Sequence, residues 1–122
     1  MINRKDDMDK MKIAVPTSNG LLSAHFGHCD EFTIVEVDPD SKQFTGTQTV
    51  AAPEHEPGLL PRWLHEMGAT VIIAGGMGRR AQELFARNGI QVCVGAPVAP
   101  PADIVAAYLD GTLETGSNLC DH

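Results

Sequence analysis

Two short apolar runs in the second half of the chain constrain the fold most strongly: TVIIAGG at residues 70–76 and IQVCVG at residues 90–95. Both are nearly continuous rather than alternating, which is typical of strands buried on both faces of a sheet. Between them, the apolar residues of segment 77–85 fall on one face of a helix, which Asn88 and Gly89 end. A strand, a helix and a second strand in this order form a right-handed crossover, so the two strands are expected to be parallel.

The first half of the chain has a different pattern, with three predicted strands and no predicted helix between them. The strands are KIAVP at residues 12–16, FTIVEVD at residues 32–38 and KQFTGTQTV at residues 42–50. The turn at residues 38–41 is short, and Pro39 supplies the fixed φ that turns use. A turn of this length makes the second and third strands antiparallel.

Joined in the simplest way, the five predicted strands form one mixed sheet. Numbered along the chain, their order is 3-2-1-4-5, and strand 2 is the only antiparallel member. Helical periodicity also covers residues 59–67 and 104–109, so helices are expected on both faces of the sheet. The predicted fold class is therefore α/β, with the ribonuclease-H-like three-layer arrangement.

The length of 122 residues suits a single domain. Residues 1–11 lack apolar periodicity and are predicted to be a disordered arm, residues 12–113 the domain, and residues 114–122 a flexible tail. No apolar run has the length of a membrane span and the start of the chain has no signal-peptide core, so we expect a cytoplasmic protein without membrane contact. The net charge of −7 argues against sequence-independent binding to nucleic acid, which needs a basic face.

The most unusual stretch is HFGHC, which contains His25, His28 and Cys29 within five residues. Imidazole nitrogen and thiolate sulfur suit zinc, copper, iron and iron–sulfur species. Gly27 lets the backbone between the two histidines bend tightly. Phe26 is expected to anchor the loop by packing. The spacing is compatible with joint coordination of a metal.

A second loop, GGMGRR at residues 75–80, is expected to face the histidine cluster. It follows the strand predicted to neighbour KIAVP, and ligands of open α/β sheets bind at the carboxyl ends of such strands. Backbone amides at the start of the following helix favour an anion. The residues assigned to this wall are Gly75, Gly76, Met77, Gly78 and Arg79. An anionic metal–sulfur cluster would suit both loops, since HFGHC offers soft ligands and GGMGRR offers an anion-binding site.

Three segments, KIAVPT, AHFGHCDEF and VIIAGGMGRRAQELFARNGIQV, occur in this order and resemble the dinitrogenase iron–molybdenum cofactor biosynthesis family, the NifX/NafY-type cofactor-carrier domain. The resemblance spans residues 12–113 and implies a ribonuclease-H-like fold. It implies a non-catalytic protein that binds and carries or stores an iron–sulfur or iron–molybdenum–sulfur cluster, with cluster donor and acceptor proteins as partners. It carries the ligand role to His25, His28 and Cys29. Small members similar to the orange protein imply a molybdenum–copper–sulfur cluster as another cargo.

Other interpretations stay open. The same three ligands could hold a single zinc or copper ion, and GGMGRR alone could serve an anion-binding regulatory domain. A nuclease of the ribonuclease H type is disfavoured, because that chemistry needs several carboxylates around magnesium and KIAVP supplies none.

The remaining histidines and cysteines are assigned from their neighbours in sequence. His55 lies between two glutamates, and its role as a ligand is open. Cys93 lies between two valines and is predicted to be a buried structural thiol. Cys120 and His122 end a tail that is long enough to return to the site, since twelve extended residues span about 36 Å. Three cysteines are an odd number, which argues against a disulfide framework.

Overall fold

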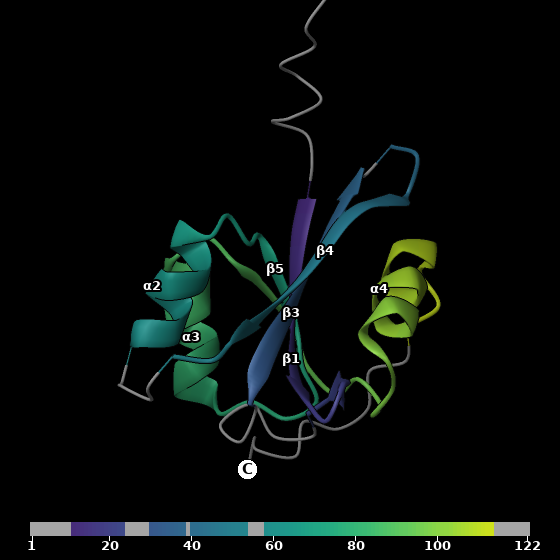
Figure 1. The fold of residues 1–122 in the computed structure, drawn as a ribbon. Coiled ribbons are helices and arrows are strands. Elements are labelled where there is room, and N and C mark those ends of the chain that lie inside the picture. The colour runs from purple at the N-terminus through teal and green to yellow at the C-terminus, as the bar shows by residue number, and fades with distance from the viewer. Residues whose placement is uncertain (1–10, 24–29, 39, 54–57, 114–122) are drawn as a thin grey trace, which may run out of the picture.

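The computed structural model describes residues 11–23, 30–38, 40–53 and 58–113 (Figure 1). The strands are β1 (Met11–Ser18), β2 (Leu21–Leu22), β3 (Glu31–Asp38), β4 (Gln43–Ala51), β5 (Val71–Ile73) and β6 (Gln91–Cys93). The helices are α2 (Leu59–Glu66), α3 (Arg79–Arg87) and α4 (Pro101–Asp110). The predicted arm and tail lie outside the described residues, except that β1 begins at Met11, one residue inside the predicted arm.

The strands form one mixed sheet whose path is β4-β3-β1-β5-β6. The pairs β1–β5 and β5–β6 are parallel, whereas β3 is antiparallel to both of its neighbours, β1 and β4. The predicted mixed α/β fold class is thus confirmed. The predicted number of five strands is wrong, because the short strand β2 also pairs with β1 and makes the sheet six-stranded.

The extra strand arises from a two-residue turn directly after β1. Asn19 and Gly20 both have positive φ, at 56° and 80°, which is the backbone that a tight hairpin requires. The hairpin sets Thr17 opposite Leu22 and Ser18 opposite Leu21. Asn-Gly is a strong hairpin signal, but a strand of two residues has no periodicity, so apolar period does not predict β2.

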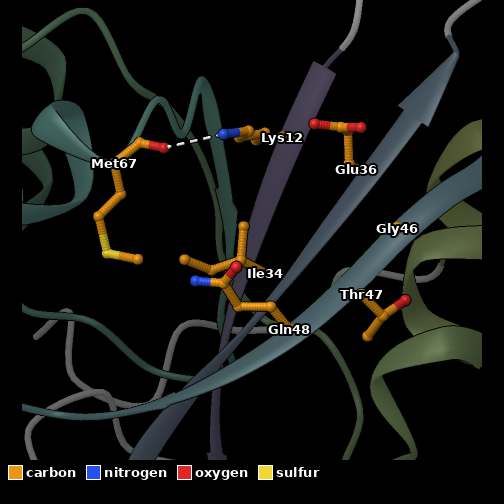
Figure 2. Close-up of a pocket in the computed structure, with 7 residues that line it drawn as sticks. All are labelled: Lys12, Ile34, Glu36, Gly46, Thr47, Gln48 and Met67. Carbon is orange, nitrogen blue, oxygen red and sulfur yellow. Dashed lines mark hydrogen bonds between the residues drawn. The ribbon is translucent and has the colours of Figure 1, made fainter.

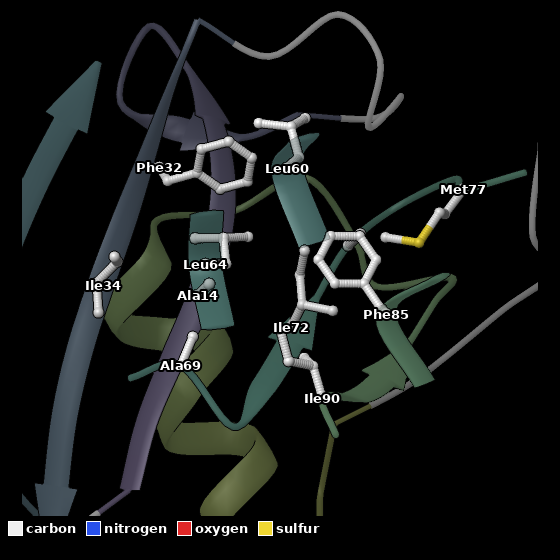
Figure 3. Close-up of a cluster of buried hydrophobic side chains, with 11 residues drawn as sticks. Ala14, Phe32, Ile34, Leu60, Leu64, Ala69, Ile72, Met77, Phe85 and Ile90 are labelled. Atoms are coloured by element: carbon white, nitrogen blue, oxygen red, sulfur yellow. The ribbon is translucent and has the colours of Figure 1, made fainter. Parts of the chain in front are cut away.

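Helices cover both faces of the sheet (Figure 1). On one face, α2 and α3 pack on a buried cluster (Figure 3) of Ala14, Phe32, Ile34, Leu60, Leu64, Ala69, Ile72, Ala74, Met77, Phe85 and Ile90. On the other face, α4 packs on a cluster of Ile13, Val15, Leu22, Val35, Val37, Val71, Ile73, Ala96, Ile104 and Val105. Successive residues of β1 alternate between the two clusters, as the pleat of a strand requires.

The described helices are short, with eight, nine and ten residues in α2, α3 and α4. None of the helices in the described part of the chain has the length and apolar character that a bilayer crossing needs.

Candidate functional site

The carboxyl end of β1 holds both flanks of the HFGHC segment. The backbone N–H of Ser23 donates to the carbonyl of Pro16 at 2.8 Å, and that of Asp30 donates to the carbonyl of Thr17 at 3.0 Å. Residues 24–29 lie outside the described residues, so the placement of His25, Phe26, Gly27, His28 and Cys29 stays a prediction. What the structure fixes is that the chain enters and leaves this segment beside two adjacent residues of β1.

A buried hydroxyl pair locks this end of the sheet. The Thr17 side chain is fully buried, and its Oγ1 donates to the carbonyl of Glu31 at 3.2 Å. The same atom lies 3.4 Å from Oγ1 of Thr33, which is also buried. Since buried hydroxyls need such partners, the two threonines fix how the end of β1 sits against the start of β3.

The end of β4 is tied to the same place. The backbone N–H of Ala52 donates to the carbonyl of Asp30 at 3.0 Å. Residues 54–57 follow two positions later and include His55, which lies outside the described residues. Ala52, which precedes residues 54–57, therefore lies beside Asp30, which follows the HFGHC segment.

The GGMG segment follows β5 at the same edge of the sheet. Because β5 is parallel to β1, with Ala14 opposite Ile72, Gly75 and Gly76 come at the level where β1 ends. Both glycines are buried. The backbone N–H of Gly95 donates to the carbonyl of Gly75, which ties the loop after β6 to this segment. The carbonyl of Gly75 is therefore held by the neighbouring loop.

Met77 belongs to the core. Its side chain is fully buried in the cluster under α2 and α3 (Figure 3). Its carbonyl accepts a hydrogen bond from Nε2 of Gln82 at 2.9 Å, which fixes the turn into α3. The prediction that Met77 lines the site is therefore reduced to its main chain, because the sulfur points into the apolar layer.

No side chain caps the N-terminus of α3. Gly78 is the N-cap, with φ −65° and ψ 154°. A Cβ added at Gly78 would meet nothing within 4 Å, so packing does not require glycine there. Arg79 and Arg80 are exposed. The first turn of α3 thus combines the positive end of the helix dipole with two cationic side chains.

Cys93 lies on the opposite face of the sheet from α3. It ends β6 and packs, half-buried, against the cluster under α4. Burial raises the pKa of its thiol above the ordinary value. The prediction that Cys93 is buried is wrong, because the residue is half-buried, and its structural role stays a prediction.

Ligands for a metal are not assembled elsewhere in the described part of the chain. Among those residues, no three His, Cys, Asp or Glu side chains lie close enough to hold an ion. His65 is exposed in the last turn of α2. The described residues therefore supply anchors for the flanks of the HFGHC segment, and the metal ligands stay a prediction.

Two hollows lie along β3 and β4, and the larger of them reaches Gly20, Glu31 and Thr33 near the carboxyl end of β1. The smaller, of about 220 Å³, lies at the amino end of β1, where Nζ of Lys12 donates to the carbonyl of Met67 at 3.2 Å (Figure 2). The larger, of about 290 Å³, lies between β4 and the start of α4. Neither hollow is predictable from the sequence, because each is lined by residues far apart along the chain.

Residues 9–111 match the family model of the dinitrogenase iron-molybdenum cofactor. The chain is 33% identical over 108 residues to an uncharacterized protein, MJ0580, of Methanocaldococcus jannaschii, with 85% of this chain and 90% of the relative covered. It is similar to the crystal structure of PH0822, with a TM-score of 0.80, 29% identity, and 88% of this chain and 96% of that chain covered. It shares its fold with the apo orange protein of Desulfovibrio gigas, with a TM-score of 0.68, 24% identity, and 88% and 94% of the two chains covered.

Proposed function

Because this chain belongs to the dinitrogenase iron-molybdenum cofactor family, we propose that it binds a metal–sulfur cluster and carries or stores it during cofactor assembly. The cargo we propose is an iron–sulfur or iron–molybdenum–sulfur cluster, with a molybdenum–copper–sulfur cluster as the alternative. The protein holds the cluster without catalysing a reaction. Its partners are the cytoplasmic proteins that donate and accept the cluster.

The observation that carries the proposal is the anchoring of both flanks of HFGHC at the carboxyl end of β1. Ser23 and Asp30 bond to Pro16 and Thr17, at 2.8 and 3.0 Å. This end of β1 is next to the GGMG segment in the sheet, and it is the edge at which open α/β sheets bind ligands. A loop whose two ends are hydrogen-bonded to a strand positions metal ligands more precisely than a loop with unanchored ends.

We assign the ligands to His25, His28 and Cys29. Cysteine thiolate and neutral imidazole are the forms that bind metal, so protons compete with the cluster. Retention of the cluster should therefore weaken as the pH falls through the range in which histidine is protonated.

The opposite wall would hold the charge of the cluster. Sulfide-bridged clusters are anionic, and the uncapped start of α3 with Arg79 offers N–H donors and positive charge. The buried main chain at Gly75 and Gly76 lets a bulky inorganic group approach closely, since no side chain intervenes. Gly76→Val should block that approach while the sheet still forms.

The proposal can be tested by anaerobic titration with two probes, ferrous iron with sulfide and tetrathiomolybdate with copper(I). Visible absorption reports a bound cluster. Trp63 is the only tryptophan of the chain, and its ring packs edge-on against Phe32 with 5.6 Å between centroids, so its fluorescence reports on the same end of the sheet. We expect His25→Ala, His28→Ala and Cys29→Ala each to lower cluster retention, with native circular dichroism.

The matched control is His65→Ala, because His65 is an exposed histidine on α2. It should retain the cluster as the wild type does. If the triple variant of His25, His28 and Cys29 bound either cluster as tightly as the wild type, the site would not be in this loop. A colourless complex with stoichiometric zinc would favour the mononuclear metal site instead.

A further inference from the structure

The edge strand β4 is the most exposed element of the sheet. It has a single neighbour, β3, among the described strands, and it stands at the end of the sheet path. Eight of its nine residues are exposed, and only Val50 is half-buried. One row of its backbone N–H and C=O groups therefore points away from β3, which is the arrangement that recruits another strand.

The two edges of the sheet differ in how they are protected. The edge strand β6 has only three residues, and short edges recruit strands poorly. By contrast, β4 has nine residues, QFTGTQTVA, with no Lys, Arg, Asp, Glu or Pro among them. Its one irregularity is the register shift between Glu36 and Val37, which leaves Thr45 as the extra residue of a bulge. Beyond that bulge, residues 46–51 form a regular, uncharged edge.

We propose that β4 is a self-association surface, on which a second copy of this chain pairs its own β4 antiparallel across a two-fold axis at Gln48. A two-fold interface presents the same patch from both copies, so the pairing must match the strand with itself. About Gln48 this match is good: Thr47 lies opposite Thr49 of the copy, and Gly46 lies opposite Val50. Threonine pairs across antiparallel strands are stabilising.

The two faces of β4 support the same register. Gln48 and Ile34 lie on the side of the hollow that Lys12 and Met67 line, whereas the Thr47 side chain points to the opposite side (Figure 2). Gly46 has no side chain and lines that hollow, and a Cβ there would meet only Glu36, at 3.9 Å. The branched side chain of Val50 from the copy would fill the space that Gly46 leaves open.

The other face adds apolar contact. Phe44 is 40% exposed and lines the hollow of about 290 Å³ together with Thr47, Thr49 and Pro100. An aromatic ring at the start of a paired strand can cover the end of the copy's strand. Charge favours this patch as well, because each copy has a net charge of −7 and two copies approach most easily through an uncharged surface.

Light scattering during size-exclusion chromatography tests the proposal, with the full chain loaded at about 100 µM, well above a micromolar Kd. We expect the wild type to have twice the chain mass of 13.1 kDa. Gln48→Lys places two like charges directly opposite each other at the axis, so it should give monomers. Gln43→Lys adds the same charge at the first residue of β4, which lies beyond the paired segment, and should leave the dimer intact.

Circular dichroism checks that both variants are folded, as expected for exposed positions. Hydrogen exchange gives an independent readout, because those amides of residues 46–50 that point away from β3 should exchange more slowly in the dimer than in the diluted protein. A monomeric wild type would overturn the proposal, even if a strand of another protein covered β4. So would a dimeric Gln48→Lys variant, or equal dissociation of both variants.

Discussion

The two faces of the sheet are packed in different ways. Under α2 and α3, the central strand β1 contributes the small residue Ala14, and the helices contribute large ones such as Leu64 and Phe85. Under α4, the strands contribute branched residues such as Ile13, and the helix adds only Ile104 and Val105 to the buried set. In Figure 1, α2 and α3 lie on one side of the sheet and α4 lies on the other.

This difference shows how one strand can serve two unlike layers. The small side chain of Ala14 leaves room for helix side chains to reach β1, so the α2/α3 layer depends on large helix residues such as Phe85. Branched strand residues already fill the space on the other face, so α4 needs only a narrow apolar stripe. The predicted site adjoins the first layer, because α3 begins directly after the GGMG segment.

The largest effect should come from removing the main anchor of the α2/α3 layer. Phe85 is fully buried, and Phe85→Ala should lower the free energy of unfolding by about 3–5 kcal/mol through lost burial and an unfilled cavity. Denaturant titration followed by circular dichroism measures it. The exposed Glu83→Ala on the same helix is the control and should change stability little. A loss at Phe85 below that of an exposed position would show that α3 is not anchored by its side chains.

A smaller effect is expected under α4. Ile104 is buried, with 2% of its surface exposed, and Ile104→Ala should cost about 2–3 kcal/mol. The single helix can shift to close part of the cavity, so the cost should stay below that of Phe85→Ala. The same titration, with Asp103→Ala as the exposed neighbour, measures it. Equal costs at Ile104 and Phe85 would remove the contrast between the layers.

The same contrast explains what the sequence could predict. The three helices follow from apolar period, and the continuous apolar run at residues 71–73 correctly predicts a buried strand, β5. The same prediction is wrong for β6, whose residues are exposed or half-buried because it lies at the end of the sheet. The strand β2 did not follow from apolar period, because two residues carry no period and its only signal is Asn19-Gly20. The openness of β4 did not either, since a sequence shows alternation but not whether a helix covers the strand.

For the site, the sequence predicted the GGMG segment but not how deeply its residues are buried. Apolar spacing marks Met77 as a core residue, and it is fully buried, so its assignment to the site does not extend to its side chain. Gly75 and Gly76 are buried, which the motif alone does not reveal. The ligand role of His25, His28 and Cys29 stays a prediction, since it depends on residues outside the described ones.

The smallest effect concerns pH, and it separates the two layers chemically. Every member of the α2/α3 cluster is an apolar residue that cannot ionise in the accessible range. The α4 face has Cys93 and Tyr108 at its margin, and burial raises the pKa of both above their ordinary values. A second cause for Tyr108 is the negative charge of an ionised Cys93, which raises the pKa of the phenol further. Alkaline loss of stability should therefore begin under α4.

For Cys93, the folded state holds the thiol proton more tightly than the unfolded state does. Its contribution to stability is thus complete below the ordinary thiol pKa and is lost as the pH rises through the raised one. At neutral pH, Cys93→Ala should cost about 1 kcal/mol through lost burial. The cost should shrink as the pH rises past the ordinary thiol pKa, because only the wild type loses stability by ionising this group. Denaturant titrations at a series of pH values measure it, and Tyr108→Phe separates the part due to the phenol. A cost that stays constant with pH would show that the folded structure does not resist ionisation of Cys93.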